Sequence, residues 1–153
     1  MLRVTKLTDY ASVVLTVLAS APDAVLSATG LAERAGLEPP TVAKVLKPLA
    51  QAGLVQAFRG VAGGYRLARP PAQISLVEIV EAMEGPLAMT ECSIHEGQCG
   101  IEHSCSARAN WRRINDVVAD VLRKVSLADM LSPAPALAAA SPRKTIPLAL
   151  DAN

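Results

Sequence analysis

Apolar side chains recur at helical spacing along the first fifty residues. Residues 4–20 carry them at positions 7, 10, 11, 14, 15 and 18, which predicts an amphipathic helix. Residues 26–35 predict a short second helix with inward positions at 31, 32 and 35, and Gly36 suits its C-terminal cap. Leu37-Glu38 then forms a turn.

A third helix should begin at Pro39-Pro40, because proline is tolerated in a first helical turn, and should end at Gly53. Its expected inward positions are Val42, Val45, Leu46 and Leu49. Pro48 lies well inside and removes one backbone hydrogen bond, so we expect a kink or an irregular last turn. Two helices joined by a glycine-containing turn are typical of a helix-turn-helix.

The pattern changes to that of a β-hairpin after Gly53. Residues 54–58 alternate as a strand, residues 59–64 form a glycine-rich turn, and residues 65–67 return before Pro70-Pro71 ends the hairpin. A hairpin that follows a helix-turn-helix makes a wing.

The second half of the chain predicts two more helices. Ser75 and Glu78 form a capping box before a helix over residues 76–84, which Gly85-Pro86 ends. A long helix is expected over residues 107–125, with an apolar stripe at Trp111, Ile114, Val118, Val121 and Val125 that Val117 and Leu122 widen. The stripe suits either the core or a dimer seam. A short capped turn follows at residues 126–129.

The predicted fold is mainly α with a small β-hairpin. We expect a winged helix-turn-helix DNA-binding domain over 1–71 and a short helix with a cysteine loop over 72–106. A dimerisation helix should occupy 107–131. The tail, 132–153, holds four prolines and no amphipathic period, so we expect it to be disordered or weakly docked.

Composition fits this fold and adds a charge asymmetry. Half of the 153 residues are apolar, and no apolar run is long enough to span a membrane, so we expect a cytoplasmic protein without a membrane partner. Residues 1–70 hold eight Lys/Arg and four acids, a net charge of +4, whereas residues 71–131 hold five and nine, a net charge of −4. A basic N-terminal module that meets phosphates is one interpretation, and an ordinary solvated surface is the other.

The third helix and the wing carry the candidate contacts with duplex DNA. The early exposed residues of the helix suit a major groove: Pro40, Thr41, Ala43, Lys44 and Lys47. Arg59 can reach the minor groove or the backbone, and Gly63 and Gly64 would permit a close approach. The alternative is a winged helix used for protein contacts in a dimeric adaptor.

Three cysteines, Cys92, Cys99 and Cys105, lie within fourteen residues, and an odd number leaves at least one thiol outside internal disulfides. Their clustering suits a metal centre. Zinc is the main competitor to an iron–sulfur cluster, although the tight CxxC pairs typical of zinc modules are absent. A disulfide switch without metal is also open. A thiol oxidoreductase is disfavoured for lack of a CxxC site, so we expect no enzyme.

Three segments, together with the three cysteines, resemble the IscR/NsrR-type transcription regulators, the Rrf-two family: Lys6–Ala11, Gly53–Val55 and the wing Arg59–Leu67. Two further segments, Leu87–Cys92 and Glu102–Cys105, look most like the regulators of the SUF iron–sulfur assembly operon. The resemblance implies a homodimeric repressor or activator on a two-fold operator. It implies a 2Fe-2S or 4Fe-4S cluster on the three cysteines, base reading by Thr41, Ala43 and Lys44, and a minor-groove contact by Arg59.

The resemblance leaves the fourth cluster ligand open. One branch of the family uses a histidine three residues after the last cysteine, and that position here is Arg108. Asp9 matches the acid that another branch supplies from the partner subunit. His103 and His95 are nearby in the loop, and Asp9 is the first candidate with His103 second. An ordinary acid at a helix N-terminus is the competing interpretation of Asp9.

Overall fold

The computed structural model describes residues 3–90, 93, 100–101 and 104–132. Its elements follow in the order α1 (Lys6–Ala19), α2 (Ala28–Ala35), α3 (Pro39–Gln51), β1 (Val55–Phe58), β2 (Gly64–Leu67), the 3-10 turn η1 (Pro71–Gln73), α4 (Leu76–Glu84), α6 (Arg108–Lys124) and α7 (Leu127–Leu131). The predicted mainly helical fold with a two-stranded hairpin is confirmed. The remainder of the predicted tail, residues 133–153, lies outside the described residues.

The first three helices share one core. Most inward positions expected from the periodicity of α1 and α3 are buried, among them Leu15, Leu18, Val45 and Leu49. Leu7, also expected to face inward, is 41% exposed, and Tyr10 is half-buried. The amphipathic pattern therefore identified which helix faces meet. These contacts set the position of α3 relative to the hairpin.

The second helix begins later than expected. Ser27 is its N-cap, with its side chain accepting a hydrogen bond from the Gly30 N–H. Leu26 instead pairs with Tyr65 of β2 through two backbone hydrogen bonds of 2.8 and 2.9 Å. The prediction of a helix from Leu26 was wrong by two residues, because an apolar position next to a capping serine served the sheet. Gly36 closes the helix at φ 64°, as expected.

The third helix continues through Pro48 as one element. It ends in a Schellman motif, where Gly53 has φ 70° and donates to the Ala50 carbonyl while Leu54 donates to the Leu49 carbonyl. The irregularity expected near Pro48 does not break the helix.

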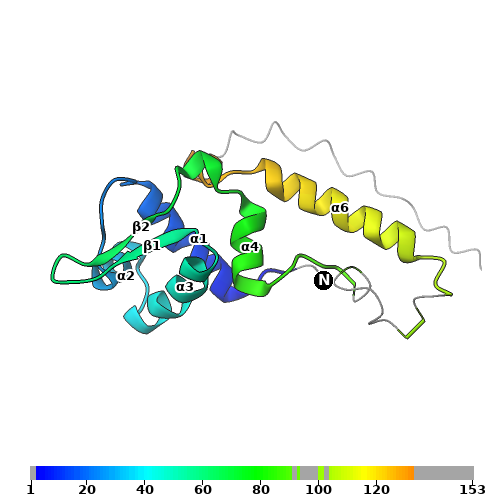
Figure 1. Ribbon diagram of the computed structural model, residues 1–153, viewed down its shortest axis with the longest axis horizontal. Helices are drawn as coiled ribbons and strands as arrows, with labels where there is room; N and C mark the ends of the chain where they lie inside the picture. Colours follow the sequence, from blue (N-terminus) through cyan, green and yellow to red (C-terminus); the bar gives the residue numbers. More distant parts are fainter. Residues whose placement is uncertain (1–2, 91–92, 94–99, 102–103, 133–153) are drawn as a thin grey trace, which may run out of the picture.

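The hairpin strands are antiparallel, with Val55 opposite Leu67 and Phe58 opposite Gly64. Figure 1 shows the hairpin projecting at one end of the molecule, α6 lying towards the other, and α4 standing between them.

The C-terminal helices join the winged unit through main-chain contacts. The Leu76 N–H donates to the Val125 carbonyl and the Leu127 N–H to the Ile74 carbonyl, both at 2.8 Å. Leu127 is fully buried in the common core, and α7 contacts α1 and η1. The junction between α6 and α7 is thus fixed to the start of α4. No helix in the described part of the chain is long and apolar enough to cross a membrane.

Candidate functional site

The exposed face of α3 carries most of the residues expected to meet DNA. Pro40, Ala43, Lys44 and Lys47 are exposed at i, i+3, i+4 and i+7, whereas Thr41 is half-buried. The opposite face of the helix lies in the core. One side of α3 is therefore available as a surface for a partner.

Residues 39–77 contain no acidic residue. Their five cations are Lys44, Lys47, Arg59, Arg66 and Arg69. Arg69 is committed to Glu78, with Nη2 2.8 Å from Oε1. The other four lie on α3 and the hairpin, which makes this part of the molecule basic.

Arg59 lies in the turn of the wing, where the sequence predicted it, whereas two glycines of the wing are needed for packing. Arg59 is exposed in the turn that joins β1 and β2. A Cβ added to Gly64 would overlap the Leu26 carbonyl, and a Cβ added to Gly63 would lie 2.5 Å from the Phe58 carbonyl oxygen. Both glycines are therefore required by packing inside the wing. Their contact with DNA stays a prediction.

Only one of the three cysteines is described. Cys105 is half-buried and lies three residues before α6 begins at Arg108. Cys92, Cys99, His95 and His103 lie outside the described residues. Within the described part of the chain, no three His, Cys, Asp or Glu side chains come together to hold a metal ion.

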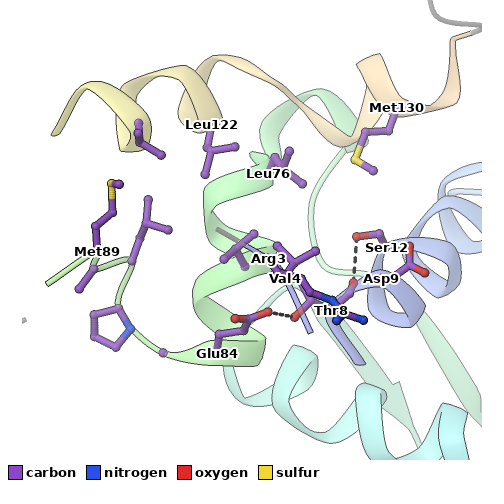
Figure 2. Close-up of a pocket in the computed structure, with 16 residues that line it drawn as sticks. Arg3, Val4, Thr8, Asp9, Ser12, Leu76, Glu84, Met89, Leu122 and Met130 are labelled. Atoms are coloured by element: carbon purple, nitrogen blue, oxygen red, sulfur yellow. Dashed lines mark hydrogen bonds between the residues drawn. The ribbon is translucent and has the colours of Figure 1, made fainter. Parts of the chain in front are cut away.

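Asp9, the other candidate ligand, lies in the first turn of α1 and is exposed. It borders a groove of about 720 Å³ between α1, α4, the segment 85–89 and α6, with Met130 at one end (Figure 2). The segment 85–89 leads directly into the cysteine-containing part of the chain. The structure therefore places Asp9 on the same groove as the approach to the first cysteine.

One carboxylate holds the end of α4 against the start of α1. Glu84 Oε1 accepts hydrogen bonds from the Thr5 N–H at 2.7 Å and from the Thr8 hydroxyl at 2.5 Å, as Figure 2 shows for Thr8. Thr8 is 2% exposed, and Thr5 is the N-cap of α1. The hydrogen bond from Thr8, with that from Thr5, lowers the pKa of Glu84 below its ordinary value.

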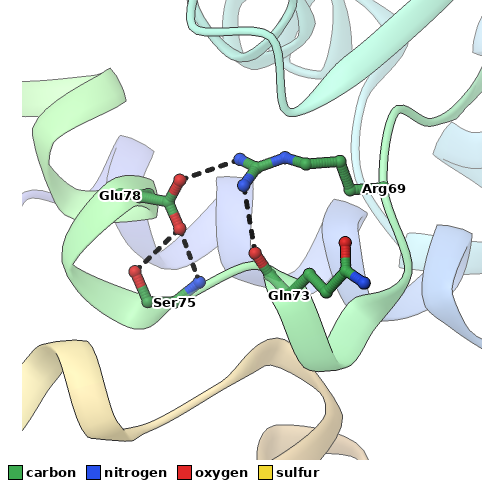
Figure 3. A network of polar contacts seen from close by, with 4 residues as sticks. All are labelled: Arg69, Gln73, Ser75 and Glu78. Atoms are coloured by element: carbon green, nitrogen blue, oxygen red, sulfur yellow. Dashed lines mark hydrogen bonds and ion pairs between the residues drawn. The ribbon is translucent and has the colours of Figure 1, made fainter.

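A second carboxylate joins the wing to α4. Glu78 accepts from Arg69 with one oxygen and from the Ser75 N–H and hydroxyl with the other, at 2.8–2.9 Å (Figure 3). Arg69 also donates to the Gln73 carbonyl at 3.1 Å. Desolvation alone would raise the pKa of Glu78, but the hydrogen bonds from Ser75 and Arg69 together outweigh it and lower the pKa. The capping box was expected from the sequence, and the arginine was not.

One part of the apolar stripe of α6 lines the groove, and another part is exposed. Val118 and Leu122 line the groove, and Ala119 is buried. Trp111, Ile114, Val117 and Val121 of the same helix are 40–58% exposed. Part of the stripe expected to suit either the core or a dimer seam thus borders the groove beside α4, and part of it is exposed. The dimer seam stays a prediction.

Several residues that position the site gave no sequence signal. Thr8 and Glu84 are 76 positions apart, and Met89, whose N–H donates to Asn115 Oδ1 at 3.2 Å, is 26 positions from it. No periodicity or motif links such pairs.

Comparison with known proteins identifies the family. Residues 4–133 match the model of the family Rrf2, described as an iron-dependent transcriptional regulator. Protein aau3 of Rhizobium meliloti is 33% identical over 135 residues, which cover 88% of each chain.

Two solved structures share the fold. CymR (YrzC), the global cysteine regulator of B. subtilis, superimposes with a TM-score of 0.67 at 29% identity, covering 86% of this chain and 97% of CymR. IscR of T. potens gives a TM-score of 0.63 at 30% identity, covering 85% and 86%. The chain therefore belongs to the Rrf2 family of transcriptional regulators.

Proposed function

We propose that this chain is a nonenzymatic regulator that binds duplex DNA through α3 and the hairpin. The observation that carries the proposal is the acid-free run of residues 39–77, in which Lys44, Lys47 and Arg59 are exposed. Cations without neighbouring carboxylates attract phosphates and release their counterions on binding. The first turns of α3 would enter the major groove, with Thr41 and Lys44 at base edges, and Arg59 would reach the minor groove.

The exposed face of α6 supports a homodimer as the binding form. Four large apolar side chains along one helix are more than isolated surface positions, and a second copy would cover them. A two-fold dimer presents two recognition helices to a two-fold operator. In this scheme residues 1–71 bind DNA, residues 72–106 sense, and residues 107–131 join the two copies.

We further propose that the sensor is an iron–sulfur cluster held by Cys92, Cys99 and Cys105. The donor chemistry fits, because thiolates are the usual ligands of such clusters. Asp9 of the second copy is the first candidate for the fourth ligand and His103 the second. Asp9 is supported by its exposure on the groove beside residues 85–89. When bound, such a cluster supplies a centre that iron supply and oxidants alter.

The coupling from sensor to DNA would pass through this chain's own contacts. Asp9 follows Thr8, whose hydroxyl binds Glu84 at the end of α4. A displacement of Asp9 on cluster binding would therefore move the contact between α1 and α4. A coupling of about 1–3 kcal/mol is typical of allosteric regulators. Repression of iron–sulfur assembly genes is the regulatory role that the resemblance of residues 87–92 and 102–105 favours.

A thiol sensor is the second candidate. The solved structure of the B. subtilis cysteine regulator is covered over 97% of its length by this fold. Cysteine thiols can switch by forming a disulfide, without metal. A zinc-binding form of the same winged-helix regulator is the remaining alternative.

Anaerobic purification separates these candidates. The cluster hypothesis expects a coloured protein with iron and sulfide, lost in Cys92→Ala and altered in Asp9→Ala but not in a matched Asp23→Ala. A colourless protein with stoichiometric zinc would support the zinc form. A metal-free protein whose DNA affinity follows thiol oxidation would support the thiol sensor. DNA binding itself is tested by Lys44→Ala and Arg59→Ala in gel shifts, where unchanged affinity in both would refute the interface.

A further inference from the structure

The outer face of the hairpin carries a cation that no motif singles out. The register pairs Gln56 with Arg66 and Phe58 with Gly64, so Gln56, Phe58 and Arg66 lie on one face of the two strands. Val55 and Leu67, on the other face, are buried. Arg66 and Phe58 therefore lie on the side of the hairpin that is turned away from the core.

Phe58 positions the Arg66 guanidinium. The guanidinium carbon lies 5.1 Å from the centre of the Phe58 ring, and Nη2 lies 3.4 Å from Gln56 Oε1. Gly64, directly opposite Phe58, has no side chain, which leaves the ring open to its diagonal neighbour. A stacked guanidinium loses less freedom when it binds a further group, because part of its entropy has already been lost.

The charge of Arg66 is not neutralised by the surrounding protein. No carboxylate among the described residues lies within salt-bridge distance of it, in contrast to Arg69 three residues later. Its planar group keeps N–H donors for a second acceptor. Phe58 remains 39% exposed beside it.

We propose that Arg66, held over Phe58, is a further contact with a DNA phosphate, which extends the interface from the tip of the wing along its outer face. Duplex DNA is the partner that the charge favours, because Arg66 belongs to the same acid-free run of residues 39–77 as Arg59, Lys44 and Lys47. Guanidinium groups suit phosphate oxygens in geometry and charge. The contact carries no sequence information and positions the wing.

The inference rests on the proposed DNA binding, so the test begins with the unmodified protein. Its affinity for a mixed-sequence DNA duplex is measured over a range of salt concentrations. Arg66→Ala is expected to weaken binding about three- to tenfold and to reduce the slope of log affinity against log salt by about 0.9, the value for one phosphate. Arg66→Lys should keep most of the slope. Phe58→Leu should weaken binding while leaving the slope unchanged, because the charge stays and its positioning is lost.

Arg123→Ala is the matched control. It removes the same charge from an exposed arginine on α6, away from the hairpin. Equal slopes and affinities for Arg66→Ala and Arg123→Ala would overturn the phosphate contact while leaving the proposed function intact. Wild-type protein that shows no salt-dependent binding would overturn both. If Arg66→Ala lowers thermal stability, the phosphate contact is tested by the two other variants alone. Arg66→Lys should then keep most of the salt slope, and Phe58→Leu should weaken binding without changing the slope.

Discussion

The hydroxyl of Thr8 and the carboxylate of Glu84 meet at 2.5 Å although 76 positions separate them. Thr8 lies in the first turn of α1 beside the candidate ligand Asp9, and Glu84 is the last residue of α4 before the chain turns at Gly85. Gly85 has φ 86°, a conformation that favours glycine. The contact therefore ties the start of the DNA-binding unit to the point where the chain leaves for the cysteines.

Removing this contact should destabilise the protein. Glu84→Ala leaves the buried Thr8 hydroxyl without that acceptor, and we expect a loss of about 1–2 kcal/mol in the free energy of unfolding. Urea denaturation at neutral pH measures it. Glu33→Ala, on the exposed face of α2, is the control and should change stability by less than about 0.5 kcal/mol. An equal loss in both variants would contradict the role given to Glu84.

The protein should become less stable in acid as a small set of hydrogen-bonded carboxylates takes up protons. Hydrogen bonds lower the pKa values of Glu84, Glu78 and Asp129. For Asp129, these hydrogen bonds come from the side chain and the backbone of Ser126. A lowered folded-state pKa gives stability that is present above the ordinary glutamate value of 4.5 and is lost as the pH falls through the folded value. Urea unfolding between neutral pH and pH 3 should show this decline. Glu84→Gln should show a shallower one, and an unchanged profile would count against the shift.

Gly64→Ala should damage the wing. The new Cβ would overlap the Leu26 carbonyl, which forms half of the two-bond bridge to Tyr65, so the hairpin or the residues before α2 must move. We expect a loss of about 1–3 kcal/mol, as for an overpacked core. Gly100→Ala is the control, because no atom of the described residues lies within 4 Å of the added atom. Thermal unfolding of the two variants provides the comparison.

A charge on the exposed face of α6 should separate the two copies. Ile114→Glu would bury a carboxylate in the proposed seam, and we expect a shift from dimer to monomer with little loss of secondary structure. Sedimentation measures the mass and circular dichroism the folding. Ala109→Glu adds the same charge off the apolar face and should remain dimeric. A dimer that persists in Ile114→Glu would place the interface elsewhere.

The sequence predicted elements better than it predicted what joins them. The periodicities identified α1, α3 and α6, because burial of one face imposes a regular spacing on the chain. The capping box identified α4. Leu26 was misassigned because an apolar residue before a cap suits a helix and a strand equally. The apolar stripe of α6 left a core helix and a dimer seam both open, because a stripe reports how much of a helix is apolar and does not report which partner covers it.

The candidate site divides in the same way. Residue types and spacing marked Lys44, Lys47, Arg59 and Cys105, since each carries chemistry of its own. The pair Thr8 and Glu84 and the pair Phe58 and Arg66 depend on tertiary distance and on register, which the order of residues does not reveal. Gly63 and Gly64 were noticed for the right property, small size, and the structure supplies an internal reason for it.

The two main-chain hydrogen bonds that join Ile74 and Leu76 to the α6–α7 junction close the chain from α4 to α6 into a ring. The cysteine-containing stretch connects α4 to α6 covalently on one side of this ring. The two hydrogen bonds connect them on the other side. A single proteolytic cut between residues 90 and 104 would therefore give two fragments that stay associated, held by these two hydrogen bonds and by buried Leu127. After such a cut, α6 would remain attached to the winged unit although the chain through the cysteines is broken.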